Sequence, residues 1–132
     1  MDTDKKQLRN THQRQLVLET VLQSKDHPVA DTIYERAREM DQTISKGTVY
    51  RNLNLLAELG EIRKLSMPIG PDHYDFNTEN HYHFICNKCF CVVDANLPYN
   101  EEFNSARADM PGYETLWHRL VLVGLCPQCA KQ

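Results

Sequence analysis

Four cysteines stand in two pairs that have the spacing of zinc ligands. Cys86 and Cys89 form one Cys-x-x-Cys pair, and Cys126 and Cys129 form a second pair near the end of the chain. Two such pairs can supply the four thiolates of a tetrahedral structural zinc site, and the metal would join segments that are distant in the sequence. Two disulfides or a redox dithiol are the alternatives. Residues 1–6 do not resemble a signal peptide, so the chain is predicted to be cytoplasmic, where thiols stay reduced.

Two histidines precede the first cysteine pair and are separated by one residue. If this segment is a β-strand, the side chains of His81 and His83 point to the same face. Two adjacent neutral imidazoles can bind a transition metal when oxygen or nitrogen ligands complete the site. Candidate partners are Asp75, Asp94 and His27. The alternative is a pair of histidines that face the solvent.

The composition is that of a small globular protein. The chain has 132 residues, of which 41% are hydrophobic and 25% are charged, and this length allows one domain or two very small ones. No apolar run approaches the length of a membrane span. The formal net charge is −3, but 11 of the 15 Lys and Arg residues lie in residues 1–66. The first half therefore carries most of the cations, and the second half resembles an acidic metal-binding region.

The first half has the pattern of three helices and a hairpin. Hydrophobic spacing predicts helices over residues 11–24, 29–40 and 45–59, with Ser45 as the N-cap of the third helix and Gly60 at its end. Residues 61–66 and 73–77 flank a Gly/Pro turn, which predicts a β-hairpin. The positions expected to face inward are Leu16, Val17, Val21, Leu22, Ile33, Tyr34, Ala37, Met40, Val49, Leu53, Leu56 and Leu59.

Three short helices followed by a hairpin are typical of a winged-helix DNA-binding domain. The third helix would be the recognition helix, which presents polar side chains to the major groove. The side chains expected to face DNA are Lys46, Thr48, Tyr50, Arg51 and Asn54. The alternative is a plain helical domain with a solvated polar face.

The second half is predicted to be a small α/β domain. Residues 82–86, 90–94 and 115–125 have the pattern of strands, and residues 99–109 have that of a short helix with Phe103 and Ala106 inward. A domain of this size buries little core, so zinc and dimerisation would both stabilise it. The predicted fold class is α+β, with an N-terminal winged-helix DNA-binding domain at residues 1–74. A small α/β metal-binding and dimerisation domain with a four-cysteine zinc site is predicted at residues 75–132.

The order of these features resembles the ferric uptake regulator (Fur) superfamily over nearly the whole chain. A winged helix is followed by the motif His-x-His-x-x-Cys-x-x-Cys and then by a terminal Cys-x-x-Cys pair. Residues 27–31, 33–34 and 47–53 resemble the DNA-binding signatures of that family, and residues 74–76 resemble its hinge.

Within the superfamily, the chain is most similar to the peroxide-sensing branch. This resemblance implies a regulatory Fe(II) or Mn(II) site beside the structural Zn(II) site, with the ligands His27, Asp75, His81, His83 and Asp94. In iron-sensing members, the positions of Asp75 and Asp94 are more often glutamate. The resemblance also implies that His27 or His81 is oxidised when bound Fe(II) meets hydrogen peroxide.

The resemblance predicts a metal-dependent transcriptional repressor and not an enzyme. Such a protein would bind a double-stranded DNA operator as a homodimer, with no membrane partner. The favoured interpretation is a peroxide sensor in which Fe(II)-catalysed oxidation of a ligand histidine releases DNA, and the alternative is an iron-responsive repressor of metal-uptake genes. Two hypotheses come from other classes of protein. They are a zinc-dependent hydrolase built on His81, His83 and Asp94, and a zinc-stapled protein-interaction module without DNA.

Three features depart from the family pattern. Only ten residues precede Thr11, so the helix that usually comes before the helix-turn-helix is expected to be much reduced. Cys91 is a fifth thiol, which we expect to be a small buried side chain and not a ligand. A further metal site of some relatives is expected to be absent, because two of the four matching residues are poor ligands, and His118 is expected to hold no metal. These residues are Asn80, Tyr82, Glu101 and His118.

Overall fold

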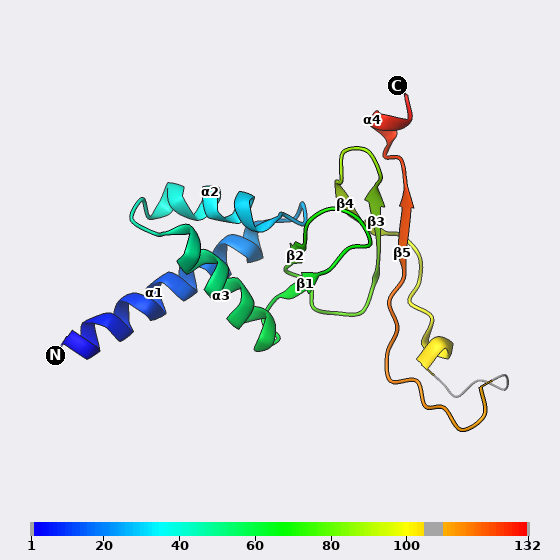
Figure 1. Cartoon of the computed structure of the whole chain (residues 1–132), viewed down its shortest axis with the longest axis horizontal. Coiled ribbons are helices and arrows are strands. Elements are labelled where there is room, and N and C mark those ends of the chain that lie inside the picture. Colours follow the sequence, from blue (N-terminus) through cyan, green and yellow to red (C-terminus); the bar gives the residue numbers. More distant parts are fainter. Residues whose placement is uncertain (1, 105–109, 132) are drawn as a thin grey trace. The chain divides into compact units, whose positions relative to one another are not determined.

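The computed structural model describes residues 2–104 and 110–131, with side chains from residue 7 onward. The chain divides into two compact units, Met1–Thr78 and Glu79–Gln132, and each is described by itself. Figure 1 labels the elements along the chain. They are α1 (Asp2–Gln23), α2 (Ala30–Met40), α3 (Lys46–Glu58), β1 (Arg63–Leu65), β2 (His73–Asp75), β3 (Tyr82–Cys86), β4 (Val92–Ala95), the 3-10 helix η1 (Glu101–Asn104), β5 (Val121–Gly124) and α4 (Pro127–Ala130).

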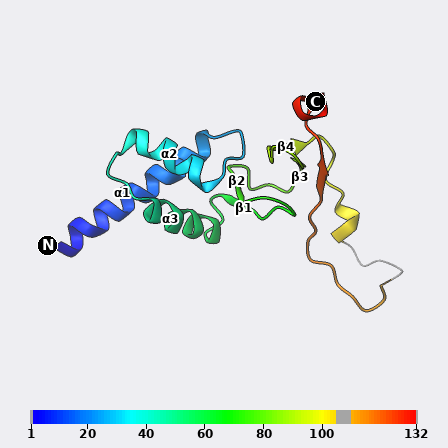
Figure 2. The same ribbon diagram turned by 45° about the horizontal axis from the view of Figure 1, so that its top comes forward.

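Helices α1, α2 and α3 of the first unit pack around one hydrophobic core, and both views show α2 and α3 lying against α1 (Figures 1 and 2). The predicted spacing of apolar residues is the cause, because it gives each helix one apolar face. The core consists of Leu16, Val17, Val21, Ile33, Ala37, Ile44, Val49, Leu53, Leu56, Ile62 and Tyr74.

Helix α1 is longer than predicted. It begins at Asp2, so the predicted start at residue 11 and the expected reduction of the preceding helix are both wrong. Residues 2–10 contain no glycine or proline, and nothing in this segment stops a helix from continuing. Its early part is not covered by the core, since Leu8 is 71% exposed.

Helices α2 and α3 agree with their predicted ranges to within a residue or two. The Ser45 hydroxyl accepts a hydrogen bond from the Thr48 N–H at 3.1 Å, and Gly60 has φ +77°, as expected of an N-cap and of a glycine that ends a helix. Three residues predicted to face inward are instead exposed: Leu22, Met40 and Leu59. Each lies at the end of its helix, where the neighbouring helices no longer cover it.

The predicted hairpin follows α3. Strands β1 and β2 pair antiparallel, with Leu65 opposite His73 and Arg63 opposite Asp75. An isolated bridge joins His73 to Val29, so β2 also contacts the segment that leads into α2. The hairpin is thereby attached to the helical core on the side of β2.

The second unit is a three-stranded sheet in the order β4-β3-β5. The central strand β3 pairs antiparallel with β4 and parallel with β5. The predicted α+β class is confirmed, because the helical unit precedes this sheet in the chain. The predicted division into domains at residues 74 and 75 stays a prediction, and in the structure the pairing of β2 with β1 keeps Asp75 in the first unit.

Two predicted elements of the second unit differ from expectation. The strand predicted over residues 115–125 is reduced to Val121–Gly124, because β3 offers partners only from His83 to Cys86. In the described part of the helix predicted over residues 99–109, the structure has a 3-10 turn at Glu101–Asn104, and Phe103 is 39% exposed instead of inward. Residues 105–109, including Ala106, lie outside the described residues.

No helix among residues 2–104 and 110–131 combines the length and the apolar character that crossing a membrane requires.

We expect Leu53→Ala to destabilise the first unit. Leu53 is fully buried, and truncation of such a side chain lowers the free energy of unfolding by about 2–5 kcal/mol. Leu59→Ala is the matched control, because Leu59 is 60% exposed and surface changes usually stay within about 0.5 kcal/mol. Urea unfolding followed by helical circular dichroism measures both, and equal losses in the two variants would contradict this core.

Candidate metal centres and nucleic-acid interface

The four paired cysteines come together in the second unit. Cys86 ends β3, and parallel pairing places Cys86 opposite Gly124 of β5. The carboxyl ends of both strands therefore lie at the same edge, which brings Cys126 at the start of α4 close to Cys86. One sulfur from each of the four cysteines lies within 4.8 Å of the others, as tetrahedral zinc coordination requires. The further ligands are Cys89 and Cys129.

Backbone amides surround the Cys86 sulfur. The N–H groups of Cys89, Cys126 and Lys88 donate to Cys86 Sγ at 3.5, 3.4 and 3.4 Å. These hydrogen bonds, led by that of Cys89, lower the pKa of Cys86 to about 5. The thiol is therefore ionised at neutral pH, in the state that binds a cation.

Cys129 has the opposite tendency. Its hydrogen bond with the Cys126 thiol and its burial raise the pKa of Cys129 to about 12. Uptake of zinc must then displace a proton from Cys129, so zinc binding is favoured as pH rises. Four sulfur donors in this arrangement fit Zn(II).

Cys91 is exposed, so the expectation that it is buried is wrong. It directly precedes β4, an edge strand of the sheet, where no further strand covers it among the described residues. It is not a member of the four-cysteine group.

In the first unit, His27 and Asp75 form a buried pair. His27 Nε2 lies 3.3 Å from Asp75 Oδ2, and the two side chains are 6% and 2% exposed. The other carboxylate oxygen of Asp75 accepts the N–H of Asn77 at 2.9 Å. His27 follows α1 and has φ +51°, a left-handed conformation that is uncommon for residues other than glycine. This pair offers one imidazole nitrogen and one carboxylate oxygen to a metal.

In the second unit, His81 and His83 lie on the same face, as predicted, with ring centroids 4.4 Å apart. Antiparallel pairing places Asp94 opposite His83, and Asp94 Oδ1 lies 3.1 Å from His81 Nε2 and 3.6 Å from His83 Nε2. His81 Nδ1 lies 2.6 Å from the carbonyl oxygen of Glu79, so Nδ1 carries a proton, which leaves Nε2 as the ring nitrogen that could bind a metal.

The first unit offers one imidazole nitrogen and one carboxylate oxygen, and the second unit offers two imidazole nitrogens and one carboxylate oxygen. Mixed nitrogen and oxygen donors suit divalent first-row metals such as Fe(II) and Mn(II), in contrast to the four sulfur donors of the cysteine group. The His and Asp residues therefore fit a regulatory metal of this kind, and the cysteines fit structural zinc.

His118 takes part in a network of hydrogen bonds. Its Nε2 lies 2.8 Å from the Tyr82 hydroxyl, and its Nδ1 lies 2.7 Å from Asn104 Oδ1. The ring also stacks on Tyr99, with centroids 4.5 Å apart. Both ring nitrogens are thus used by side chains, in agreement with the chemistry expected of a metal-free His118, although the absence of a metal there stays a prediction.

Four of the five predicted DNA-facing residues on α3 are exposed: Lys46, Tyr50, Arg51 and Asn54. Thr48 is half-buried and receives hydrogen bonds from Ser45 and Arg51, so its hydroxyl is used in the helix cap. None of these five residues belongs to the buried stripe of α3.

Asp31 of α2 contacts two of these residues. Its carboxylate accepts a hydrogen bond from the Tyr50 hydroxyl and lies 3.1 Å from Lys46 Nζ. The hydrogen bond from Tyr50 and then that from Lys46 lower the pKa of Asp31. The carboxylate is therefore ionised and links α2 to the predicted recognition helix.

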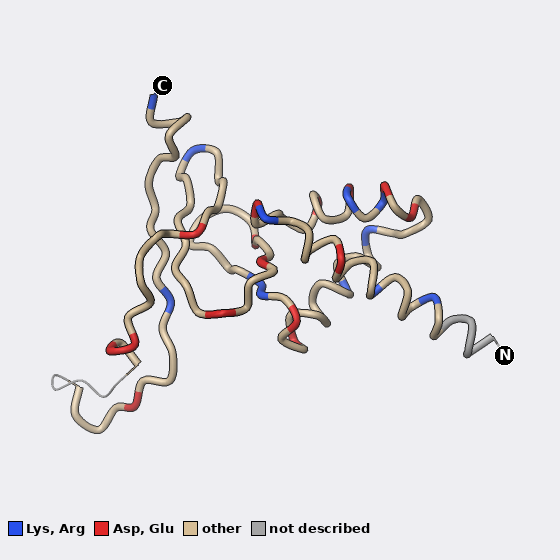
Figure 3. The backbone as a smooth tube through the Cα atoms, turned by 180° about the vertical axis from the view of Figure 1, so that it is seen from behind, with Lys and Arg blue, Asp and Glu red and all other residues tan. Residues whose placement is uncertain are grey.

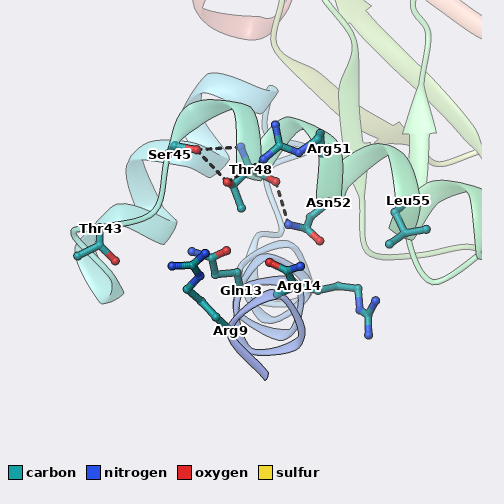
Figure 4. A pocket seen from close by; sticks show the side chains of 10 residues that line it. Arg9, Gln13, Arg14, Thr43, Ser45, Thr48, Arg51, Asn52 and Leu55 are labelled. Atoms are coloured by element: carbon teal, nitrogen blue, oxygen red, sulfur yellow. Dashed lines mark hydrogen bonds between the residues drawn. The ribbon is translucent and has the colours of Figure 1, made fainter. Parts of the chain in front are cut away.

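A pocket of 670 Å³ lies between α1 and α3. Arg9, Arg14 and Arg51 are among the residues that line the pocket, and guanidinium groups suit an anion such as a DNA phosphate. Lys and Arg recur along the helices of this unit (Figure 3). Figure 4 shows Arg9 and Gln13 of α1 on the side of α3 that carries Thr48 and Asn52, and Arg14 and Arg51 also line the pocket.

Arg9 and Arg14 are not among the residues predicted to bind DNA. A helix that begins at residue 11 cannot place Arg9, whereas a helix that begins at Asp2 carries Arg9 and Gln13 four residues apart on one face. The uninterrupted run without glycine or proline before Thr11 is the sequence signal that could have indicated it.

This chain is similar to known proteins both in sequence and in fold. A model of the ferric uptake regulator family matches residues 5–123. The peroxide-responsive repressor PerR of Staphylococcus epidermidis is 33% identical over 125 residues, covering 95% of this chain and 83% of that protein. The structure of the Helicobacter pylori ferric uptake regulator Fur, which has three functional metal binding sites, gives a TM-score of 0.80 at 25% identity and covers 100% of this chain and 89% of that chain. The Campylobacter jejuni peroxide stress regulator gives a TM-score of 0.70 at 28% identity, covering 96% of each chain.

We expect Cys126→Ser to lose its tightly bound zinc ion and to unfold the second unit. Structural zinc contributes about 10–16 kcal/mol in small zinc domains, and removal of one thiolate breaks the link between β3 and α4. Zinc content by mass spectrometry and the dispersion of amide signals in NMR spectra measure the two effects. Cys91→Ser is the control, which should keep one zinc ion per chain. A folded Cys126→Ser protein with full zinc content would contradict the assignment.

Proposed function

Because the chain belongs to the ferric uptake regulator family, we propose that it is a metal-dependent transcriptional repressor that binds operator DNA as a homodimer. What supports the proposal is that candidate ligands of the same mixed nitrogen and oxygen type occur in both units. His27 and Asp75 belong to the first, and the other three candidate ligands belong to the second. The hydrolase hypothesis is set aside, since members of this family are transcription regulators and not enzymes.

A metal held by residues of both units would fix their relative orientation. In a homodimer, this orientation sets the separation of two recognition helices, which must match successive major grooves about 34 Å apart. A metal that binds the DNA-competent arrangement more tightly than other arrangements shifts the population towards it. Metal binding and DNA binding would then strengthen each other.

The dimer is proposed to form through the sheet of the second unit. Strand β5 is an edge strand among the described strands, and its Leu122 and Val123 are 42% and 49% exposed. An exposed apolar edge strand is a template for pairing with another chain. Pairing of two β5 strands would satisfy the backbone N–H and C=O groups of this edge.

DNA is proposed to contact α3 and the pocket between α1 and α3. Tyr50 and Arg51 are exposed on α3, and Arg51 also lines the pocket together with Arg9. Helix α3 would enter the major groove, while the guanidinium groups of the pocket would hold a backbone phosphate.

The regulatory signal is proposed to be hydrogen peroxide. Both candidate carboxylate ligands are aspartates, as in the peroxide-sensing branch that the chain resembles, and the S. epidermidis relative is a peroxide-responsive repressor. When bound, Fe(II) supplies the one-electron chemistry that activates peroxide beside its ligands. His27 and His81 would be the imidazoles beside it, and one of them would gain an oxygen atom while peroxide is reduced to water. Loss of that ligand would release the link between the units.

We expect Arg51→Ala to weaken DNA binding. If Arg51 contacts phosphate, affinity falls at every sequence and the salt dependence flattens by about one unit. If it contacts a guanine, discrimination falls by about 1–3 kcal/mol at one position. Fluorescence anisotropy with Mn(II)-loaded protein and a duplex selected by the wild type measures both. Arg38→Ala is the control on α2, and identical binding by the two variants would exclude the contact.

A peroxide sensor and an iron sensor should respond differently to a pulse of hydrogen peroxide. After a brief peroxide pulse, the Fe(II)-loaded protein should gain one oxygen atom on His27 or His81 and release DNA. The Mn(II)-loaded protein should stay unmodified and bound, because Mn(II) does not readily drive the same one-electron step. Peptide mass spectrometry measures the oxidation, with the exposed His12 as an internal control. Iron-loaded protein that keeps both histidines intact and still binds DNA would favour the iron-responsive alternative.

A further inference from the structure

His73 is a buried histidine that the proposed function does not use. It lies on β2 two residues before Asp75, so both side chains emerge on the same face of the strand. The side chain is 5% exposed, and its Nδ1 lies 2.7 Å from the carbonyl oxygen of His27. This contact joins two residues 46 positions apart in the chain.

The hydrogen bond determines the form of the imidazole. A carbonyl oxygen can only accept, so His73 Nδ1 must carry the proton. The other ring nitrogen, Nε2, is buried with no hydrogen-bond partner in the part of the chain that the structure describes. An apolar side chain would fill this space without leaving a polar atom unpaired. Stability alone therefore does not account for a histidine here, whereas the contact with His27 does.

The residue that His73 contacts has an unusual backbone. His27 has φ +51°, and a non-glycine residue keeps such a conformation only when its surroundings hold it. Strand β2 supplies the restraints. The Tyr74 N–H donates to the Pro28 carbonyl at 2.9 Å, Val29 bridges to His73, and the His73 ring holds the His27 carbonyl.

We propose that His73 is a positioning residue for the regulatory metal, which keeps the peptide of His27 in the conformation that directs its imidazole towards Asp75. The proposal rests on the proposed function, because it assumes that His27 and Asp75 bind the metal. Strand β2 then has two roles in the proposed metal site. It provides Asp75 as a ligand, and it holds His27 so that Nε2 lies 3.3 Å from the carboxylate.

If the hydrogen bond from His73 to the His27 carbonyl positions the ligand, two variants of nearly equal size should differ in Mn(II) affinity. His73→Leu removes the donor, so the His27 peptide can relax and Mn(II) affinity should fall about 10–100-fold, as for other residues that orient metal ligands. His73→Asn places an amide N–H where Nδ1 lies and should keep affinity within about threefold of the wild type, because the donor to the His27 carbonyl is retained. Isothermal titration of the zinc-loaded full chain with Mn(II) measures both.

A double-mutant cycle separates positioning from general weakening of the fold. In a His27→Ala background the ligand is already lost, so adding His73→Leu should reduce Mn(II) affinity no further. Equal Mn(II) affinity in the wild type and His73→Leu overturns the proposal. So does an equal loss in His73→Asn and His73→Leu, or an undiminished effect of His73→Leu in the His27→Ala background.

A measurement on the unmodified protein tests the same idea without a variant. Nitrogen-15 NMR should show a proton on Nδ1 of His73, and a ring protonated at Nε2 alone would overturn the proposal. A wild-type chain that binds no Mn(II) would instead contradict the proposed function itself, so the two failures are distinguishable.

Discussion

The second unit depends on one constraint, the convergence of two strand ends at four cysteines. Strand β5 pairs with β3 over only four residue pairs. Few apolar side chains of this unit are buried, and the main ones are Tyr82, Ile85 and Val92. So short a parallel pairing with so little core has a small driving force. The metal ligands at the ends of β3 and β5 hold the strands in register, and that register in turn fixes the positions of His83 and its neighbours on β3.

The proposed signalling chemistry follows from the same strand. His83 lies on β3 together with the zinc ligand Cys86, and Asp94 faces it from β4. A structural metal that immobilises β3 would therefore also immobilise two of the proposed regulatory ligands. In the first unit, β2 has the corresponding role, because its pairing with β1 and its contacts with residues 27–29 hold Asp75 and His27 together. Each unit thus presents its part of the ligand set from a strand that is fixed by other interactions.

Features that are set by residues close together in the sequence were predictable, and features that are set by tertiary packing were not. Cys-x-x-Cys spacing, the Ser45 cap and the glycine that ends α3 are local patterns, and the structure has these features where they were predicted. The ends of helices were less predictable, because whether Met40 or Leu59 is covered depends on how far a neighbouring helix extends. The length of β5 depends on the residues that β3 offers as partners. The role of His73 could not be predicted, since its hydrogen bond goes to a backbone carbonyl that only the packing of β2 brings near.

The length of α1 has a mechanical consequence. Its 22 residues, at about 1.5 Å of rise each, form a rod of roughly 33 Å, close to one turn of B-DNA. Only the later part of this rod is packed in the core, through Leu16, Val17 and Val21, while the earlier part around Leu8 is exposed. The packed part holds α1 to the core, and the exposed part extends beyond the core. A tilt of α1 about its packed part would therefore displace Arg9 farther than any residue of the core.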